Sequence, residues 1–181
     1  EERLFLSPRS AFGPGAAIRG GAPVIFPQFN AWGPYARHGF ARRVPWTFLG
    51  EDAGGGGPGR LRFELRASAA TLAEWPFDFR CELAVLLGGN DLEVGLRVEN
   101  SGASAFSFSA ALHTYFAVSD TGAARLLGLR GAGYQDWAEG DAYKAWRTQE
   151  EQELAFRGEV DRIYFAAPRS LVLRDARRSL A

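Results

Sequence analysis

The sequence of 181 residues contains no methionine, one cysteine and only two histidines. The single cysteine, Cys81, cannot form an intramolecular disulfide bond, and it lies in an alternating strand pattern that predicts a buried thiol. A reducing compartment is therefore favoured, and we expect a cytoplasmic protein. Neither H-x-x-x-H nor C-x-x-C spacing occurs, so a metal site is poorly supported.

Other absences exclude further classes of protein. No apolar run is long enough to span a membrane, and no signal peptide opens the sequence. The 21 Lys and Arg residues balance 21 Asp and Glu residues, which argues against nucleic acid or an anionic membrane as a partner. A small anionic ligand is compatible with this balance, because two arginines suffice to hold one. No G-x-S-x-G motif is present, so a serine nucleophile elbow is also excluded.

The missing methionine bears on the ends of the chain as well. The sequence opens directly into the strand-like Leu4-Phe5-Leu6 and stops soon after the strand-like Leu171-Val172-Leu173. We therefore expect a fragment of a longer protein, truncated especially at the C-terminus.

What the sequence does contain is 46% hydrophobic and 13% aromatic residues, enough for one sizeable core. We therefore expect one domain over residues 1–181. Short alternating segments with turn signals at ~8–12-residue spacing are typical of an antiparallel β-sandwich or barrel-like sandwich. The predicted strands are Leu4–Leu6, Pro23–Phe29, Pro45–Leu49, Arg60–Arg66, Phe79–Leu87, Asp91–Glu99, Phe106–Ser109, Arg125–Leu129, Ile163–Ala166 and Leu171–Leu173.

Two segments are ambiguous in this pattern. We interpret Gly54–Gly59 as a hairpin turn rather than a phosphate-binding loop, because no Lys-Ser/Thr follows it. Thr148–Ala155 has the only helix-forming composition, but it is too short and too polar to predict a helix.

One of the two histidines, His113, lies within Ala110–Phe116, directly after the alternating Phe106–Ser109. Histidine has an unperturbed pKa of roughly 6.5, so it can give or take a proton near neutral pH. On a strand among aromatic residues, His113 is either a packed core residue or a proton-transfer group.

Arginines are the second candidate feature. Arg19 precedes two glycines, which permit a close backbone approach, so it is either a solvated strand-end residue or a fork-shaped donor to a carboxylate or phosphate. Arg37, Arg42 and Arg43 surround His38. They form either an ordinary polar loop or a cluster that converges on one ligand.

Asp161 interrupts the approach to the apolar Ile163–Ala166 segment. Its carboxylate is either solvated, for example in a weak surface ion pair with Arg162, or engaged by a partner.

Five segments combine these features in one order along the chain. They are Ile18–Pro23, His38–Arg42 with Trp46, Trp75–Phe77, Ala111–Phe116 and Glu159–Arg162. In this order they resemble the glucose-6-phosphate 1-epimerases (hexose-6-phosphate mutarotases) of the galactose-mutarotase-like superfamily. The resemblance covers nearly the whole chain, from about Leu4 to Asp175.

The resemblance implies an all-β fold, an antiparallel β-supersandwich that is incomplete at its C-terminal end. It also implies interconversion of the α and β anomers of a hexose 6-phosphate, without a cofactor. The expected partner is that small molecule, and the expected state is a monomer.

The resemblance also assigns roles by position. His113 matches the catalytic histidine and would act as the general acid, while Arg19 and Arg42 match the arginines that hold the phosphate and sugar. Asp161 matches a sugar-contacting aspartate.

Two further positions line the expected site. Arg37 stands where relatives often have glutamine, and His38 belongs to the motif without being the expected acid. The base of this family is a glutamate from a late strand, and no glutamate in these 181 residues matches its motif. We therefore expect little or no turnover from this chain.

Two alternatives stay open. The chain could be a non-catalytic β-sandwich that binds a carbohydrate or sugar phosphate. It could also be a structural sandwich whose arginines lie on the surface.

Overall fold

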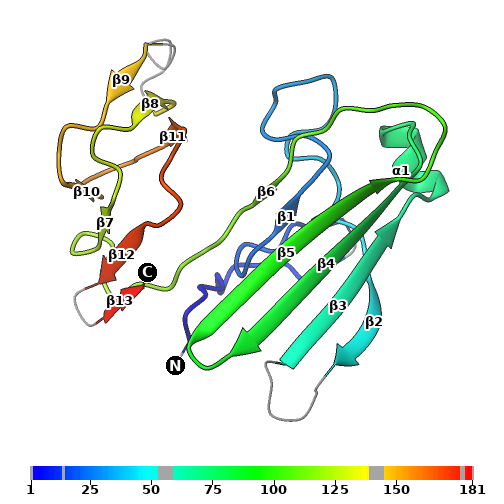
Figure 1. Ribbon diagram of the computed structural model, residues 1–181, viewed down its shortest axis with the longest axis horizontal. Coiled ribbons are helices and arrows are strands. Elements are labelled where there is room, and N and C mark those ends of the chain that lie inside the picture. The colour runs from blue at the N-terminus through cyan, green and yellow to red at the C-terminus, as the bar shows by residue number, and fades with distance from the viewer. Residues whose placement is uncertain (1, 14, 53–58, 139–144, 176–177, 181) are drawn as a thin grey trace. The chain divides into compact units, whose positions relative to one another are not determined.

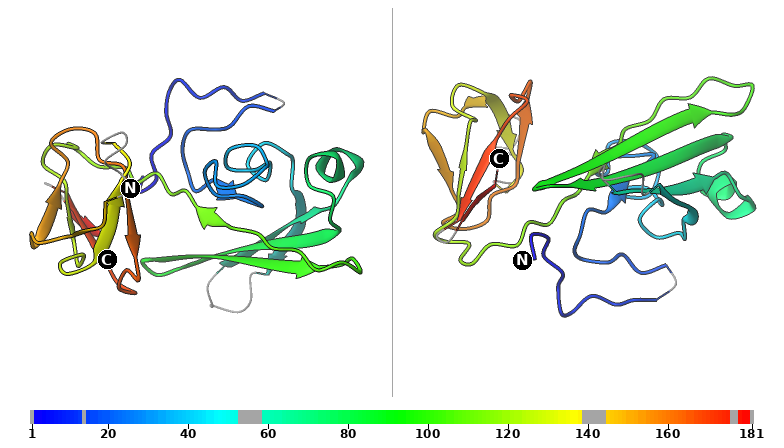
Figure 2. Two further views of the ribbon diagram at one scale, coloured as in Figure 1. Left: turned by 90° about the horizontal axis from the view of Figure 1, so that it is seen from above. Right: turned by 60° about the horizontal axis from the view of Figure 1, so that its bottom comes forward.

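The computed structural model describes residues 2–13, 15–52, 59–138, 145–175 and 178–180. They form two compact units (Figures 1 and 2). The amino-terminal unit comprises Leu6–Tyr115, and the carboxyl-terminal unit comprises Phe116–Ala181 together with Glu1–Phe5. The single domain expected over residues 1–181 stays a prediction.

The amino-terminal unit is built on a four-stranded antiparallel sheet of order β2-β3-β4-β5, with β1 and β6 paired separately. The helix α1 follows β3 (Figure 1). The elements are β1 (Val24–Ile25), β2 (Thr47–Asp52), β3 (Gly59–Arg66), α1 (Ala69–Glu74), β4 (Phe79–Gly88), β5 (Asp91–Asn100) and β6 (Ala111–Leu112).

The two faces of this sheet differ because the side chains alternate along each strand. In register, Leu65 lies opposite Cys81, and Cys81 opposite Val98, so apolar residues line one face. On the other face Arg80 is the centre of an ion-pair network with Glu64 and Glu82, at 2.5 and 3.1 Å. The alternation therefore fixes which face becomes the core.

A layer that contains β1 packs on the apolar face. Phe26, which follows β1, is fully buried, with its ring centroid 5.2 Å from that of Trp75 and 5.3 Å from that of Phe79. Aromatic rings at such separations stabilise one another beyond their burial. The core of the unit is Val24, Phe26, Phe40, Ala41, Leu65, Trp75, Phe79 and Cys81.

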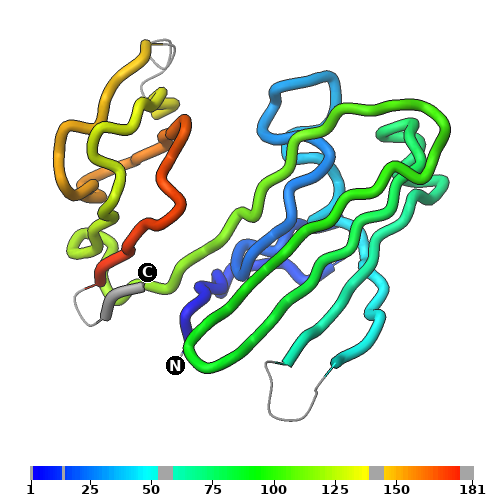
Figure 3. The backbone as a smooth tube through the Cα atoms, in the orientation of Figure 1, coloured from blue at the N-terminus to red at the C-terminus, as the bar shows by residue number. Residues whose placement is uncertain are grey.

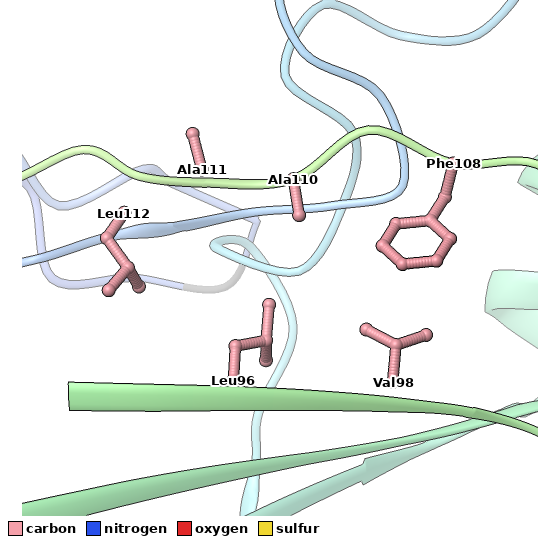
Figure 4. Close-up of a pocket in the computed structure, with 6 residues that line it drawn as sticks. All are labelled: Leu96, Val98, Phe108, Ala110, Ala111 and Leu112. Atoms are coloured by element: carbon pink, nitrogen blue, oxygen red, sulfur yellow. The ribbon is translucent and has the colours of Figure 1, made fainter. Parts of the chain in front are cut away.

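The second half of this layer lies over β5. Figure 4 shows Phe108, Ala110 and Leu112 turned toward Leu96 and Val98 of β5, while Ala111 points the other way. These six residues line a groove of about 300 Å³. The segment that leads into β6 therefore alternates between a sheet-facing side and an outward side.

The chain crosses itself closely at Phe26 and Gly39. The carbonyl of Phe26 accepts the backbone N–H groups of Phe40 and Ala41, at 3.1 and 3.2 Å. Gly39 has φ of +63°, and a Cβ placed there would lie 2.1 Å from the Phe26 carbonyl oxygen. Only glycine allows both this backbone conformation and this approach.

The carboxyl-terminal unit contains a four-stranded sheet of order β10-β7-β12-β13 and a three-stranded sheet of order β11-β8-β9. Both are antiparallel. The strands are β7 (Arg125–Leu127), β8 (Gly133–Asp136), β9 (Arg147–Thr148), β10 (Glu153–Ala155), β11 (Arg162–Phe165), β12 (Val172–Asp175) and β13 (Arg178–Leu180).

The all-β, antiparallel fold class predicted from the sequence is confirmed. The predicted strands at 60–66, 79–87 and 91–99 match β3, β4 and β5 closely. The expected turn at Gly54–Gly59 lies outside the described residues up to Pro58, and Gly59 opens β3. No helix among the described residues is long and apolar enough to cross a membrane.

Several predictions of local structure are wrong. Leu4–Leu6 forms only isolated bridges, and only Val24–Ile25 of the predicted strand Pro23–Phe29 is a strand. Phe106–Ser109 is not part of a strand. The backbone N–H of Ser109 donates to the carbonyl of Pro27, which has no N–H to continue a ladder. The helix α1 was not predicted, although the two residues of its capping box are only three positions apart in the sequence. Ser68 N–H donates to Thr71 Oγ1, and Thr71 N–H donates to Ser68 Oγ.

We predict that Gly39→Ala lowers the free energy of unfolding. The strain of a non-glycine residue in this conformation alone costs ~1–3 kcal/mol. The clash with the Phe26 carbonyl adds to this strain. Urea denaturation measures the free energy of unfolding. Gly95→Ala is the control, because its Cβ would meet no atom within 4 Å. Equal stability of the two variants would contradict the close crossing.

Candidate active site

His113 is held by the continuation of the β1–β6 pairing. Its N–H donates to the carbonyl of Pro23 at 2.9 Å, and the N–H of Tyr115 donates to the carbonyl of Gly21 at 2.8 Å. Alternation places His113 and Tyr115 on the outward side, with Ala111 in Figure 4, and their ring centroids are 5.1 Å apart. The side chain of His113 is exposed, so it is not a packed core residue.

His38 comes to the same place from the loop between Phe29 and Gly39, the blue loop above β1 in Figure 3. Its ring meets that of His113 edge to face, at a centroid distance of 5.9 Å and an angle of 81°. Its φ is +67°, a conformation that histidine tolerates better than most residues. The second histidine of the chain is therefore the direct neighbour of the first.

The protonation state of His38 follows from its partners. Its Nδ1 accepts the N–H of Asn30 at 3.2 Å, so the ring proton of the neutral form is on Nε2. Burial lowers the pKa of His38, and the charges of Arg42 and Arg37 and the neighbouring His113 lower it further. His38 is thus biased toward the neutral imidazole.

Arg42 is half-buried beside these rings. It borders a pocket of about 320 Å³ whose other lining residues are mostly apolar, and its Nε is buried without a hydrogen-bond partner among the described residues. A buried donor without an acceptor is unfavourable unless a ligand supplies one. Burial lowers the pKa of Arg42; Tyr115 opposes this shift, whereas Arg43, Arg37 and Arg19 add to it.

The arginines divide into two kinds. Arg43 donates to Glu74 at 2.9 Å and is occupied by this ion pair. Arg19, Arg37 and Arg42 form no ion pair with any described carboxylate. The charges of Arg37 and Arg42 both lower the pKa of His38, and those of Arg37 and Arg19 lower the pKa of Arg42.

Asp161 belongs to the carboxyl-terminal unit. Its carbonyl accepts the N–H of Trp137, and its side chain is exposed. The weak ion pair suggested with Arg162 is not formed, because Arg162 donates to Asp136 at 2.8 Å and lies over the ring of Tyr134. The carboxylate of Asp161 is thus not committed to its neighbour.

Sequence reasoning overlooked Tyr115 and Asn30. The signal for Tyr115 was present, because a residue two positions from His113 on an extended segment shares its face. Asn30 acts through its backbone N–H and carbonyl, which no residue type reveals. Among the described residues no group of three or more His, Cys, Asp or Glu side chains could hold a metal ion.

We predict that His38 titrates below the ordinary histidine pKa of about 6.5. Arg37→Gln should raise this pKa, because it removes a positive charge that disfavours the imidazolium. Proton NMR of the two histidine rings across pH 4–9 measures both shifts. Arg97→Gln, on β5, is the control and should leave His38 unchanged. A His38 pKa above that of free histidine would contradict the assignment.

Comparison with known proteins places these motifs in one family. The aldose 1-epimerase family model matches residues 1–181. A protein of Cenchrus ciliaris named "Putative glucose-6-phosphate 1-epimerase" is 36% identical over 97% of this chain and 54% of its own length. A Salmonella typhimurium protein of the same name is 35% identical over 97% of this chain and 57% of its own.

Solved structures agree in fold. The crystal structure of YeaD from Salmonella typhimurium, described as a "putative mutarotase", has a TM-score of 0.85 and 32% identity over 97% of this chain and 57% of its own. Slr1438 from Synechocystis has a TM-score of 0.81 and 26% identity over 97% of this chain and 63% of its own.

The chain therefore spans somewhat more than half the length of these relatives. The match to the family model covers the residues that carry both histidines and the arginine cluster. On these matches in sequence and fold, the chain belongs to the aldose 1-epimerase family.

Proposed function

We propose that this protein interconverts the α and β anomers of a hexose 6-phosphate, with glucose 6-phosphate as the first candidate. One observation carries the proposal: two histidine rings in edge-to-face contact stand beside arginines that have no carboxylate partner among the described residues. The names of its relatives point to the same reaction.

Anomer exchange needs an acid and a base. The base removes the proton of the anomeric hydroxyl while the acid protonates the ring oxygen, so that the C1–O5 bond breaks and an aldehyde forms. Rotation about C1–C2 and closure on the other face give the second anomer. Each group contributes about 10²–10⁴-fold.

In this proposal His113 is the acid, because it is exposed on the outward face and its neighbour is biased toward neutrality. Two adjacent imidazoles cannot both be charged at low cost, and the lowered pKa of His38 keeps that ring neutral beside His113. The neutral His38 carries its hydrogen on Nε2 and can donate it to a sugar oxygen.

In this proposal the arginines hold the phosphate, and the role of Asp161, which belongs to the other unit, stays a prediction from the sequence resemblance. The buried Nε of Arg42 lacks an acceptor, which an oxygen of the ligand would supply. Arg19 and Arg37 add positive charge around the same anion. The base is assigned to a glutamate whose motif is not present in these 181 residues.

A monomeric state and a cytoplasmic location complete the proposal. The buried, unpaired thiol of Cys81, whose pKa burial raises to about 12, is compatible with a reducing compartment. Binding of a sugar phosphate without turnover is the second candidate, and the two experiments below separate it from catalysis.

We predict that the chain binds glucose 6-phosphate more tightly than glucose, and that Arg42→Gln weakens the binding about tenfold or more. Loss of one charge-assisted hydrogen bond of ~1.5–3 kcal/mol is the reason. Titration calorimetry measures both affinities, and Arg97→Gln serves as the control. Equal affinity for glucose and glucose 6-phosphate would contradict a phosphate site.

We also predict that acetate restores anomer exchange. A small carboxylate in solution can replace a missing carboxylate side chain. Acetate together with the protein should therefore exchange the anomers of glucose 6-phosphate faster than the same concentration of acetate without the protein. His113→Asn should abolish the increase, since amide groups do not protonate the ring oxygen. Exchange NMR measures the rate. Binding without any acetate-dependent exchange would support the binding protein instead.

A further inference from the structure

Gln28 is a buried polar residue to which the proposed reaction assigns no role. It follows the cis peptide bond between Phe26 and Pro27, and its side chain is 3% exposed. Its Nε2 donates to the carbonyls of Tyr35 and Asn30, at 2.9 and 3.2 Å. Its Oε1 accepts the N–H of Tyr35 at 3.0 Å. The amide thus bonds to both backbone groups of Tyr35, as a neighbouring strand would.

These bonds close the loop that ends in Arg37 and His38. The carbonyl of Asn30, which Gln28 holds, also accepts the N–H of His38 at 3.1 Å. The N–H of the same Asn30 donates to Nδ1 of His38 at 3.2 Å. Asn30 and His38 both have positive φ, +50° and +67°, a conformation that persists only when its surroundings fix it.

The fit around the amide is close. A Cβ on Gly33 would lie 2.3 Å from Oε1 of Gln28, so the loop passes directly against the side chain. Phe29 lies next to Gln28 and has its ring centroid 5.6 Å from that of His38. The backbone of the loop therefore packs closely around the side chain of Gln28.

We propose that Gln28 is a positioning residue: its side-chain amide fixes Asn30, and through Asn30 it holds His38 as the Nε2–H tautomer facing His113. A histidine tautomer is set by the hydrogen bond at its other nitrogen. Gln28 acts only through the backbone, and it is distinct from the groups proposed to touch the sugar phosphate. Its consequence for catalysis rests on the proposed function.

The test is the ¹⁵N NMR spectrum of the His38 ring at a pH where it is neutral. In the unsubstituted protein we expect Nδ1 at the shift of an unprotonated nitrogen and Nε2 at that of a protonated one. Gln28→Met keeps the length of the side chain but removes all three hydrogen bonds. Its two ¹⁵N shifts should move toward each other as the tautomers mix, and the Kd for glucose 6-phosphate should rise about tenfold, because small misplacements of binding groups have large effects.

Thr71→Val is the matched control. Thr71 is also 3% exposed, lies in the same unit and caps α1 by local hydrogen bonds. The substitution should lower stability while leaving the His38 shifts unchanged. A purely structural role of Gln28 predicts the same outcome for Gln28→Met, so unchanged His38 shifts in that variant would overturn the proposal.

Two further measurements cover a variant that does not fold. Gly33→Ala displaces the Gln28 amide without altering it and should cause the same change in the His38 shifts. In the unsubstituted protein, the amide proton of Tyr35 should exchange slowly with solvent; fast exchange would overturn the proposal. Absence of anomer exchange would count against the proposed function alone, because the NMR readouts need no substrate.

Discussion

The close approach of Gly39 to the Phe26 carbonyl is the constraint on which the site depends. That carbonyl binds the N–H groups of Phe40 and Ala41, so the chain that leaves the His38 loop must pass directly over the residue that follows β1. Phe26 itself cannot shift, because its ring is buried among aromatic residues of the core. The buried position of Phe26 thereby fixes the backbone next to His38.

His113 is tied to the same segment from the other side, through the carbonyl of Pro23. Both histidines are therefore positioned by residues 23–26, although 75 positions separate them in the sequence. This explains why a short strand of only two residues, β1, is flanked by prolines: the segment serves as a support for two neighbouring chains rather than as part of a long ladder.

Sequence alone was sufficient for the long strands of the sheet, because the alternation at Leu61, Phe63 and Leu65 is local and unambiguous. It also singled out His38, His113 and the arginines. It could not show that the two rings meet, since their contact depends on pairings between distant segments. The resemblance singled out Arg42, but residue type and spacing alone could not distinguish it from Arg43: the difference is that Glu74, 31 positions further on, pairs with Arg43.

The distribution of partners gives this site its electrostatic character. Where an arginine serves the fold, as Arg43, Arg80 and Arg162 do, a carboxylate accompanies it. Around the two histidines the described chain supplies cations without such partners, and their charge lowers the pKa of His38.

Binding of a dianionic phosphate would offset that charge and allow the pKa of His38 to rise again. The neutral state of His38 therefore needs a second support that does not depend on the ligand, and the hydrogen bond from Asn30 to Nδ1 provides it. That bond cannot persist with a proton on Nδ1, so it opposes protonation of His38 when the arginines are neutralised, as the role proposed for His113 requires.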